Sequence, residues 1–279
     1  MLLERLYARP RLLEAAIALD RAAPAVWLGL LAAALLPTWA WMGRRVADGS
    51  DDPLGVLALA ALAVTAWSCR RQLRVAPRLR WLAVALLLAV ASSVAQGWWP
   101  PLPAALLGLA SLGAALAAFL PARVAAAPVM GLAVLSLPLL ASLQFYAGYP
   151  LRVLTAEASR WLLSPFFLAE RMGSSLRVDG RLVIVDAPCS GVQMLWLGYF
   201  TACVTALWAG RADKSFLARL PAVSAIVLAG NVIRNTVLVA GEAIGRPMVG
   251  NAHDVVGLAV LGFVCTGIAW VMHGNGRHV

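Results

Sequence analysis

The chain has 279 residues, of which 62% are hydrophobic and 13% are charged, and its mean hydropathy is +0.81. Soluble domains carry about 25% charged residues, so this composition excludes an ordinary soluble protein and indicates a polytopic membrane protein. The net charge of +10 does not indicate nucleic acid, because the arginines lie in short loops between apolar runs. We therefore expect the lipid bilayer, and no nucleic acid, among its partners.

The first 23 residues mix acidic and basic side chains before the first long apolar run begins. A cleavable signal peptide has a charged start, then an apolar stretch, then small residues, and this segment lacks that order. We therefore expect residues 1–23 to be retained as a helix in the membrane interface.

Apolar stretches of about 20 residues, the helix length that crosses a bilayer core about 30 Å thick, recur along the chain. They predict an all-α membrane fold, a polytopic bundle of about eight transmembrane helices. Frequent Ala and Gly residues, as in 105–118, are typical of closely packed membrane helices. The expected crossings are 24–43, 53–69, 81–99, 102–120, 124–146, 190–209, 217–239 and 253–272.

The longest segment outside these crossings is 147–188, and it contains two patterns. Residues 151–167 alternate apolar and charged groups at helical spacing, which predicts a helix lying in the membrane interface. Residues 175–188 alternate around Asp179-Gly180, a dipeptide typical of tight hairpin turns, and predict a two-stranded β-hairpin.

Loop arginines set the expected orientation. Five arginines fall in 70–80, and Arg123 and the basic residues of 210–219 lie on the same side in a count of eight crossings. Because basic loops stay in the cytoplasm, both termini are expected there and the segment 147–188 outside. The expected location is the cytoplasmic (inner) membrane.

The chain divides by chemistry at residue 146. Residues 1–146 hold the N-terminal interfacial segment and five almost wholly aliphatic crossings. Residues 147–279 hold the interfacial helix, the hairpin, three crossings and most polar residues within or beside the membrane. We therefore expect the catalytic site in 147–279.

Four cysteines stand at 69, 189, 203 and 265, without the spacing of a metal site or a disulfide framework, so no metal or cofactor is expected. Cys203 and Cys265 lie among apolar neighbours and are interpreted as packing residues, as is Cys69. Cys189 differs, because it follows Pro188 at the start of a predicted helix, where free N–H groups favour a thiolate.

Two other polar residues are expected at the level of Cys189. Arg234 lies within a crossing, and an intramembrane arginine is a functional-site hypothesis by default because burying it is costly. His253 opens the last crossing, and thiol nucleophiles pair with histidines that are distant in sequence. Further candidates around these three are Ser190, Gln193, Asn231, Asn235 and Asp254.

These residues permit covalent acyl transfer. The Cys189 thiolate would attack a peptide carbonyl, His253 would carry the proton, and Arg234 would stabilise the oxyanion. Water as the second nucleophile gives hydrolysis, and an amine or hydroxyl acceptor gives transpeptidation. The residues do not choose between these outcomes, and the acceptor nucleophile is unknown.

The stretches APCSGVQ (187–193), GNVIRN (230–235) and NAHD (251–254) resemble the exosortase/archaeosortase family of membrane cysteine transpeptidases. The resemblance implies that Cys189 is the nucleophile, Arg234 the oxyanion or substrate-orienting residue and His253 the proton-transfer partner. It also implies membrane-anchored protein substrates with a C-terminal sorting signal, made of a short motif, an apolar helix and a basic cluster.

Three other functions remain open at this point. A transporter or channel would use Arg234 to bind an anion and would not need Cys189. A membrane lipid or glycan transferase would use His253 and Asp254 and would not respond to thiol reagents. A scaffold protein would need none of these residues.

Overall fold

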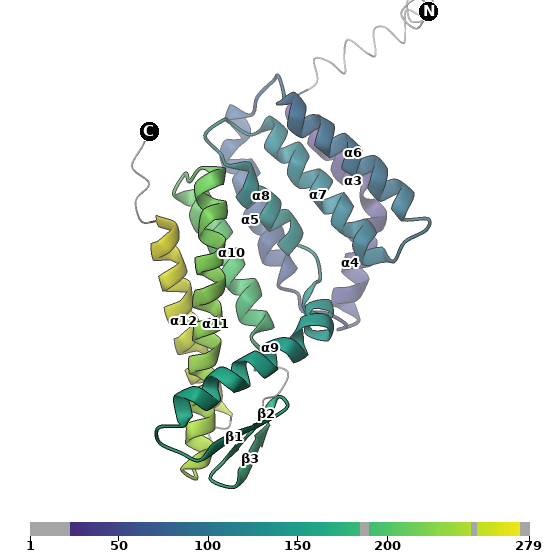
Figure 1. Ribbon diagram of the computed structural model, residues 1–279. Coiled ribbons are helices and arrows are strands. Elements are labelled where there is room, and N and C mark those ends of the chain that lie inside the picture. The colour runs from purple at the N-terminus through teal and green to yellow at the C-terminus, as the bar shows by residue number, and fades with distance from the viewer. Residues whose placement is uncertain (1–22, 185–189, 247–249, 274–279) are drawn as a thin grey trace, which may run out of the picture. The chain divides into compact units, whose positions relative to one another are not determined.

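The computed structural model describes residues 23–184, 190–246 and 250–273 (Figure 1). This part of the chain is mostly helical and carries one small antiparallel sheet, which confirms a helical fold with a short β element. The predicted interfacial segment 1–23 falls almost wholly outside the described residues.

The chain forms two compact units. The first unit consists of residues 1–41 and 64–121, and the second unit consists of residues 42–63 and 122–279. Helices α4 (Leu36–Ala47) and α5 (Gly55–Cys69) are each divided between the two units.

The first unit is built around the antiparallel pair α6 (Leu79–Ala95) and α7 (Pro101–Phe119), with α3 (Pro24–Ala34) against α7. Two buried serines join the pair, because Ser92 Oγ donates to the Ala104 carbonyl and Ser111 Oγ to the Ala85 carbonyl, both at 2.9 Å. These bonds satisfy hydroxyls that lipid cannot hydrogen-bond.

The arginine-rich loop 70–80 of this unit includes the 3₁₀ turn Arg70–Gln72 and closes the end of α7. The Arg74 and Arg78 amides donate to the last carbonyls of α7, and the Arg78 guanidinium donates to the Pro121 carbonyl at 2.8 Å. A cation at a helix C-terminus complements the partial negative charge of its free carbonyls.

The second unit is centred on α10 (Val192–Trp208), which packs against α8 (Ala126–Leu135), α11 (Asp213–Ala243) and α12 (Asn251–His273) (Figure 1). Glycines allow the close approach of these helices. A side chain at Gly198 would overlap Val227, and one at Gly230 would overlap Val264. Small residues at such contacts are the usual means of packing helices in lipid.

Helix α9 (Leu140–Leu163) differs from the expected boundaries. The predicted crossing 124–146 is two helices, α8 and the start of α9, joined by a short break and bent by 94°. Pro138 lies in the break and explains it, because proline lacks an N–H and disfavours helix in the residue before it. The predicted interfacial helix is therefore the later part of a longer helix.

The sheet has the order β1 (Ala169–Met172), β2 (Ser175–Val178) and β3 (Arg181–Ile184), all antiparallel. The hairpin at Asp179-Gly180 is confirmed, and φ values of 47° and 82° match the turn type in which both central residues are left-handed. The third strand, β1, was not expected. Its sequence, AERM, has little strand preference, and β1 is held by a second two-residue turn that begins at Gly173, where φ is 64°.

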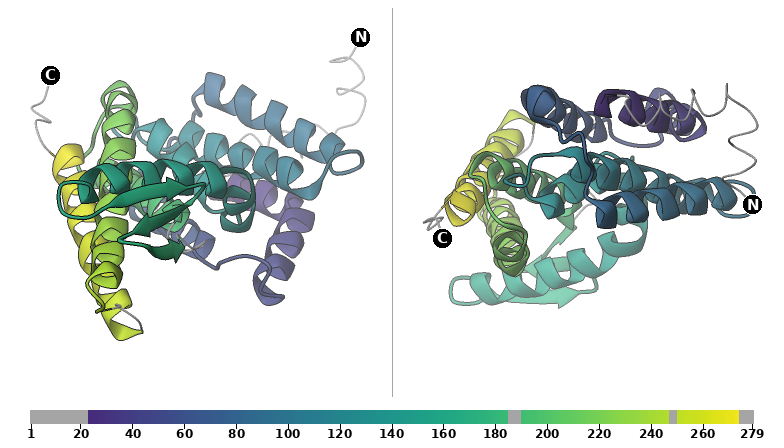
Figure 2. Two further views of the ribbon diagram at one scale, coloured as in Figure 1. Left: turned by 60° about the horizontal axis from the view of Figure 1, so that its bottom comes forward. Right: turned by 90° about the horizontal axis from the view of Figure 1, so that it is seen from above.

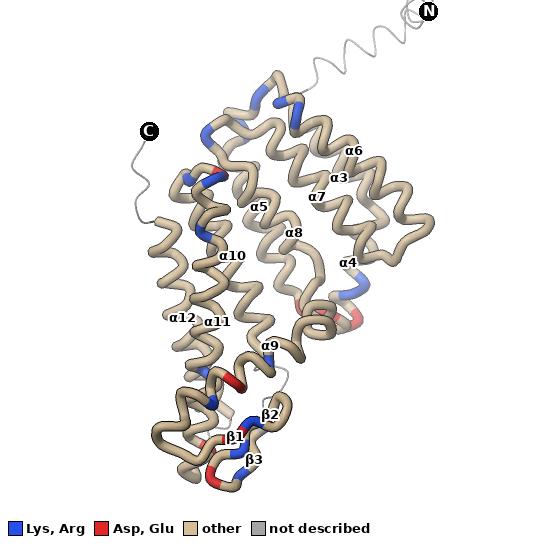
Figure 3. Tube along the Cα trace, viewed as in Figure 1, with Lys and Arg blue, Asp and Glu red and all other residues tan. Residues whose placement is uncertain are grey.

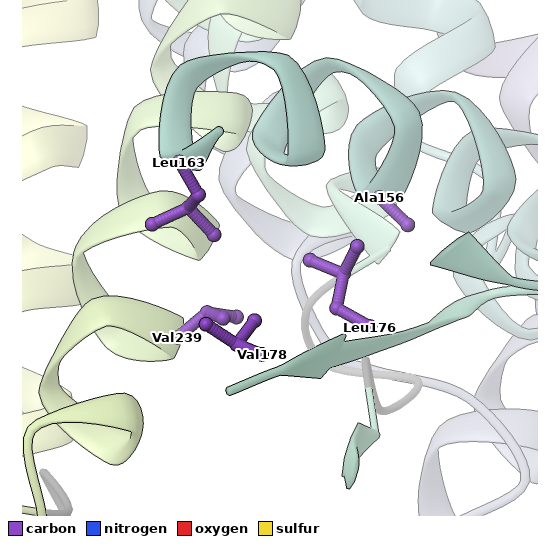
Figure 4. Packing of buried hydrophobic residues seen from close by; sticks show 5 residues of the cluster. All are labelled: Ala156, Leu163, Leu176, Val178 and Val239. Carbon is purple, nitrogen blue, oxygen red and sulfur yellow. The ribbon is translucent and has the colours of Figure 1, made fainter. Parts of the chain in front are cut away.

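One face of the sheet packs on the helices. Leu176 and Val178 of β2 are buried against Ala156 and Leu163 of α9 and against Val239 of α11 (Figure 4). Burying each aliphatic side chain of this size is worth roughly 1.5–3 kcal/mol. The sheet thus fixes the end of α9 to the end of α11, where Figure 2 also shows α9 beside the strands.

Three described helices, α7, α11 and α12, are long and apolar enough to cross a membrane, and five spans result if each bent helix pair counts as one. The bent pairs are α3 with α4 and α8 with α9. Helices α6 and α10 are apolar but have 17 residues, about 26 Å at 1.5 Å per residue. The described helices therefore make a multi-pass membrane protein, with fewer full-length spans than the eight expected.

Candidate active site

The start of α10 is a sharp corner formed by Ser190 and Gly191. Gly191 has a φ of 83°, and a Cβ added there would lie 2.8 Å from Asn231 Cγ. Both facts require glycine, because a left-handed backbone costs other residues roughly 1–2 kcal/mol. Cys189, which precedes this corner, lies outside the described residues.

Arg234 and His253 are brought together by α11 and α12. Arg234 Nη2 lies 3.0 Å from His253 Nε2. A guanidinium can only donate, so Nε2 is the acceptor and the neutral imidazole carries its proton on Nδ1. Two residues 19 positions apart in sequence thus form one polar pair.

The pair lies deeper along α11 than the sequence indicated. Helix α11 continues to Ala243, so Arg234 is nine residues, or about 14 Å, before its end. The extra turn carries Ala240 and Ala243, which pack against the cluster beneath the sheet. The expected crossing 217–239 ended four residues earlier.

Gly257 makes room for the guanidinium. It lies one turn after His253 on α12, and a Cβ there would lie 3.3 Å from Arg234 Nε and 3.4 Å from Nη2. Such distances are tighter than ordinary contact, so a side chain at 257 would displace the guanidinium.

Asn231 and Asn235 join α11 to α9. Asn231 Nδ2 donates to Thr155 Oγ1 at 3.0 Å, and Asn235 Nδ2 donates to Ser159 Oγ at 2.9 Å. The four residues stand four apart on each helix and form two rungs between them, all buried. These bonds link α11 to α9, and a role of the two asparagines in the site stays a prediction.

Ser190 is tied to the other end of α9. Its Oγ donates to Gln144 Oε1 at 2.7 Å and accepts from the Val192 amide at 3.4 Å. Sequence reasoning missed Gln144, which it had placed inside a lipid-spanning helix. A lone glutamine in an apolar run, followed four residues later by Gly148, was the available signal.

Two hollows flank the first turn of α10. The arginine hollow has a volume of about 480 Å³ and contains Arg234 and Asp254 beside apolar side chains of α10 and α12. The aspartate hollow, of about 530 Å³, lies between the loop at 49–53, the start of α9 and the corner. Gln193 lines both, and Ser190 lines the aspartate hollow.

The aspartate hollow takes its charge from the loop after α4. Asp51 is buried and accepts from the Ala141 amide at 3.2 Å, which caps the start of α9. Asp52 is exposed and lines the hollow. Asp51 also forms an ion pair of 3.3 Å with Arg45, and hydrogen bonds from Ser50 lower the pKa of Asp48 in the same loop.

The remaining cysteines lie in packing positions. Cys69 and Cys203 are buried and Cys265 is half-buried, and the sulfur of Cys203 lies against Gly131. Among the residues that the structure describes, no three His, Cys, Asp or Glu side chains gather in a group able to hold a metal ion.

Comparison with known families identifies the family of this chain. A family model described as a transmembrane exosortase (Exosortase_EpsH) matches residues 41–270. The chain belongs to the transmembrane exosortase family. Exosortases are generally cysteine transpeptidase-like membrane enzymes, and their protein substrates carry sorting signals. No curated protein and no solved structure matches the chain significantly.

The exosortase match spans α9, α10, α11 and most of α12. It therefore contains the corner at Ser190, Gln144 and the Arg234–His253 pair. His273, the last residue of α12, and His278 fall outside it.

Proposed function

We propose that this exosortase is a cysteine protease or transpeptidase that cleaves C-terminal sorting signals through an acyl-enzyme on Cys189. The observation that supports this most directly is the contact of Arg234 with His253. Gly191, two residues after Cys189, lines the same hollow as Arg234. A cation and an imidazole thus stand beside the corner that follows the thiol.

The reaction has two acyl transfers. The Cys189 thiol gives its proton to His253, and the sulfur bonds to the scissile carbonyl carbon. Arg234 stabilises the tetrahedral oxyanion, a role worth about 3–4 kcal/mol for comparable donors. The C–N bond then breaks, the leaving amine takes the proton from His253, and a thioester remains. Water or an acceptor amine or hydroxyl attacks the thioester and returns the thiol.

The Arg234–His253 bond orders these events. While Nε2 accepts from the guanidinium, its lone pair is occupied. When Arg234 turns to the substrate carbonyl, Nε2 becomes free to take the thiol proton. Oxyanion stabilisation and general base catalysis would therefore begin together, after substrate has entered.

The arginine hollow suits the junction between a polar motif and an apolar segment. Gln193, Arg234 and Asp254 provide its polar groups, and Leu258 and Leu261 continue it along α12. A substrate would place its scissile bond at the polar part and its apolar helix along the leucines.

We further propose that both termini face the cytoplasm of the inner membrane and that the site faces outward. In the second unit, charged residues gather at the two ends of the α10–α12 bundle (Figure 3). Arg211, Lys214 and Arg219 form a basic end near the start of α11, as the positive-inside rule requires of a cytoplasmic end. The eight crossings stay part of this proposal, with α6 and α10 as short spans.

The test is the pair of variants Cys189→Ala and Cys189→Ser, expressed with a substrate that carries a motif, an apolar helix and a basic cluster. Tail removal, followed by mobility shift, should stop in both variants at normal enzyme levels. Cleavage that continues undiminished in Cys189→Ala would refute the nucleophile.

The anion-transport alternative rests on the same Arg234 in its hollow. It predicts that Cys189→Ala leaves the function intact, whereas loss of Arg234 abolishes it. The transferase alternative predicts a need for His253 and Asp254 and indifference to thiol reagents. The Cys189 variants therefore separate the peptidase from both alternatives, and the need for Arg234 or for His253 and Asp254 separates the alternatives from each other.

A further inference from the structure

Gln144 contacts the residue that is covalently bonded to Cys189. Its Oε1 accepts a hydrogen bond of 2.7 Å from Ser190 Oγ. We propose that Gln144 is a positioning residue for the Cys189 nucleophile and acts on it through Ser190. The inference rests on the proposed role of Cys189 and adds a residue from a different helix, α9.

The hydrogen bond between Ser190 and Gln144 fixes the position of the corner before α10. Ser190 is 2% exposed, so water does not compete for its hydroxyl. The same hydroxyl accepts from the Val192 amide in the first turn of α10. Because consecutive Cα atoms are about 3.8 Å apart, fixing Ser190 from two sides limits where Cys189 can lie.

Gly148 provides the space for the Gln144 amide. It is buried one turn further along α9, and a Cβ there would lie 2.9 Å from Gln144 Nε2 and 3.0 Å from Cδ. Glycine in a helix interior is less favourable than alanine, so its presence here matches a need for room. The amide is therefore confined between Gly148 and Ser190.

The start of α9 is fixed as well. The Ala141 amide donates to Asp51 Oδ1, and the Asp51 side chain has no exposed surface. This cap holds the first turn of α9, one turn before Gln144. Asp51 thus fixes the start of α9, and Gln144 on α9 fixes Ser190, the residue next to the nucleophile.

Loss of the Gln144–Ser190 hydrogen bond should allow the Cys189 thiol to move away from its reactive position. A displacement of 1 Å from a reactive geometry costs about 100-fold in rate, so we expect Gln144→Ala to lower kcat by roughly 10-fold to 100-fold. KM should change less than threefold. The rate at which iodoacetamide alkylates Cys189 should fall in parallel and its pH dependence should shift, because both report the thiol itself.

The experiment uses the full-length chain in which Cys69, Cys203 and Cys265 are replaced by alanine. Its variants are Gln144→Ala, Gln144→Glu, Ser190→Ala, the Gln144→Ala/Ser190→Ala double and Gly148→Ala. Gln144→Glu keeps an acceptor oxygen and should retain most activity. The double variant should lose no more than Ser190→Ala alone, because Gln144 acts on the thiol through the Ser190 hydroxyl, which Ser190→Ala has already removed.

Gly148→Ala separates positioning from folding. Alanine favours the helix, so stability should not fall, whereas the displaced amide should lower kcat and alkylation. Phe145→Ala, an exposed neighbour on α9, is the matched control and should leave both unchanged.

Two results would overturn the inference. One is a fall in cleavage by Gln144→Ala with unchanged Cys189 alkylation, which would make Gln144 a substrate contact. The other is additive loss in the double variant. Cleavage that survives Cys189→Ala would instead refute the proposed function, and the alkylation rates would still test Gln144.

Discussion

At the residue scale, the site depends on glycines, which leave space, as much as on the polar side chains that fill it. Gly191, Gly148 and Gly257 each leave space that a Cβ would fill, beside Asn231, Gln144 and Arg234 respectively. Asn231 and Arg234 each contact a neighbouring helix, and Gln144 contacts the corner before α10. These three glycines therefore serve polar contacts.

The variant Gly257→Ala tests whether the Arg234 guanidinium needs the space that this glycine leaves. Its methyl group should move Arg234 by a few tenths of an ångström and lower kcat about tenfold, since misplacement of catalytic groups is costly. Thermal stability should hold or rise, because alanine is the better helix former. The control Gly262→Ala, on the same helix with open space around it, should have wild-type activity. Equal activity in the two variants would remove Gly257 from the site.

At the element scale, α9 is the helix that organises the second unit. Its first turn is capped by Asp51, its middle is joined to α11 by two amide–hydroxyl rungs, and its end packs on the sheet. A partly exposed cluster pairs Glu157 with Arg160 and with Arg171 of β1. Exposed pairs of this kind contribute little, so the rungs and the apolar contacts determine how α9 lies.

The rungs can be measured by a double-mutant cycle between Asn235→Ala and Ser159→Ala. Bonds of this kind in membrane proteins couple by about 0.6 kcal/mol on average, and up to about 1.7. We expect a coupling in that range in unfolding by sodium dodecyl sulfate in mixed micelles. Thr266→Ala, whose exposed hydroxyl bonds to its own helix α12, should show no coupling to Ser159→Ala. Zero coupling between Asn235 and Ser159 would contradict the link.

At the scale of the whole molecule, every described residue of the candidate site belongs to the second unit. The loop at 49–53 also belongs to it, although it precedes most of the first unit in sequence. The first unit carries the arginine-rich loop 70–80, which the positive-inside rule assigns to the cytoplasm.

The proposed orientation can be tested with cysteines placed in a chain otherwise free of cysteine. Arg177→Cys, on the exposed face of the sheet, should react with an impermeant maleimide in intact cells. Arg71→Cys, exposed in the basic loop, should react only after the membrane is permeabilised. The reverse pattern would invert the topology and place the site in the cytoplasm.

The sequence alone determined the helical membrane class, the hairpin turn and the family resemblance. Each depends on local information: the length of apolar runs, the left-handed preference of Asp179-Gly180, and short motifs around Cys189, Arg234 and His253. It also indicated that Arg234 and His253 meet, because helices that follow one another in sequence tend to be neighbours.

Only the tertiary structure decided how the site is supported. The break at Pro138 turns α9 by 94° from α8, which brings Gln144 to Ser190 and Thr155 to Asn231. No local pattern contains such a bend angle, because it depends on which distant groups cap and pack the helix. The same holds for β1, whose sequence has little strand preference and which exists because β2 pairs with it.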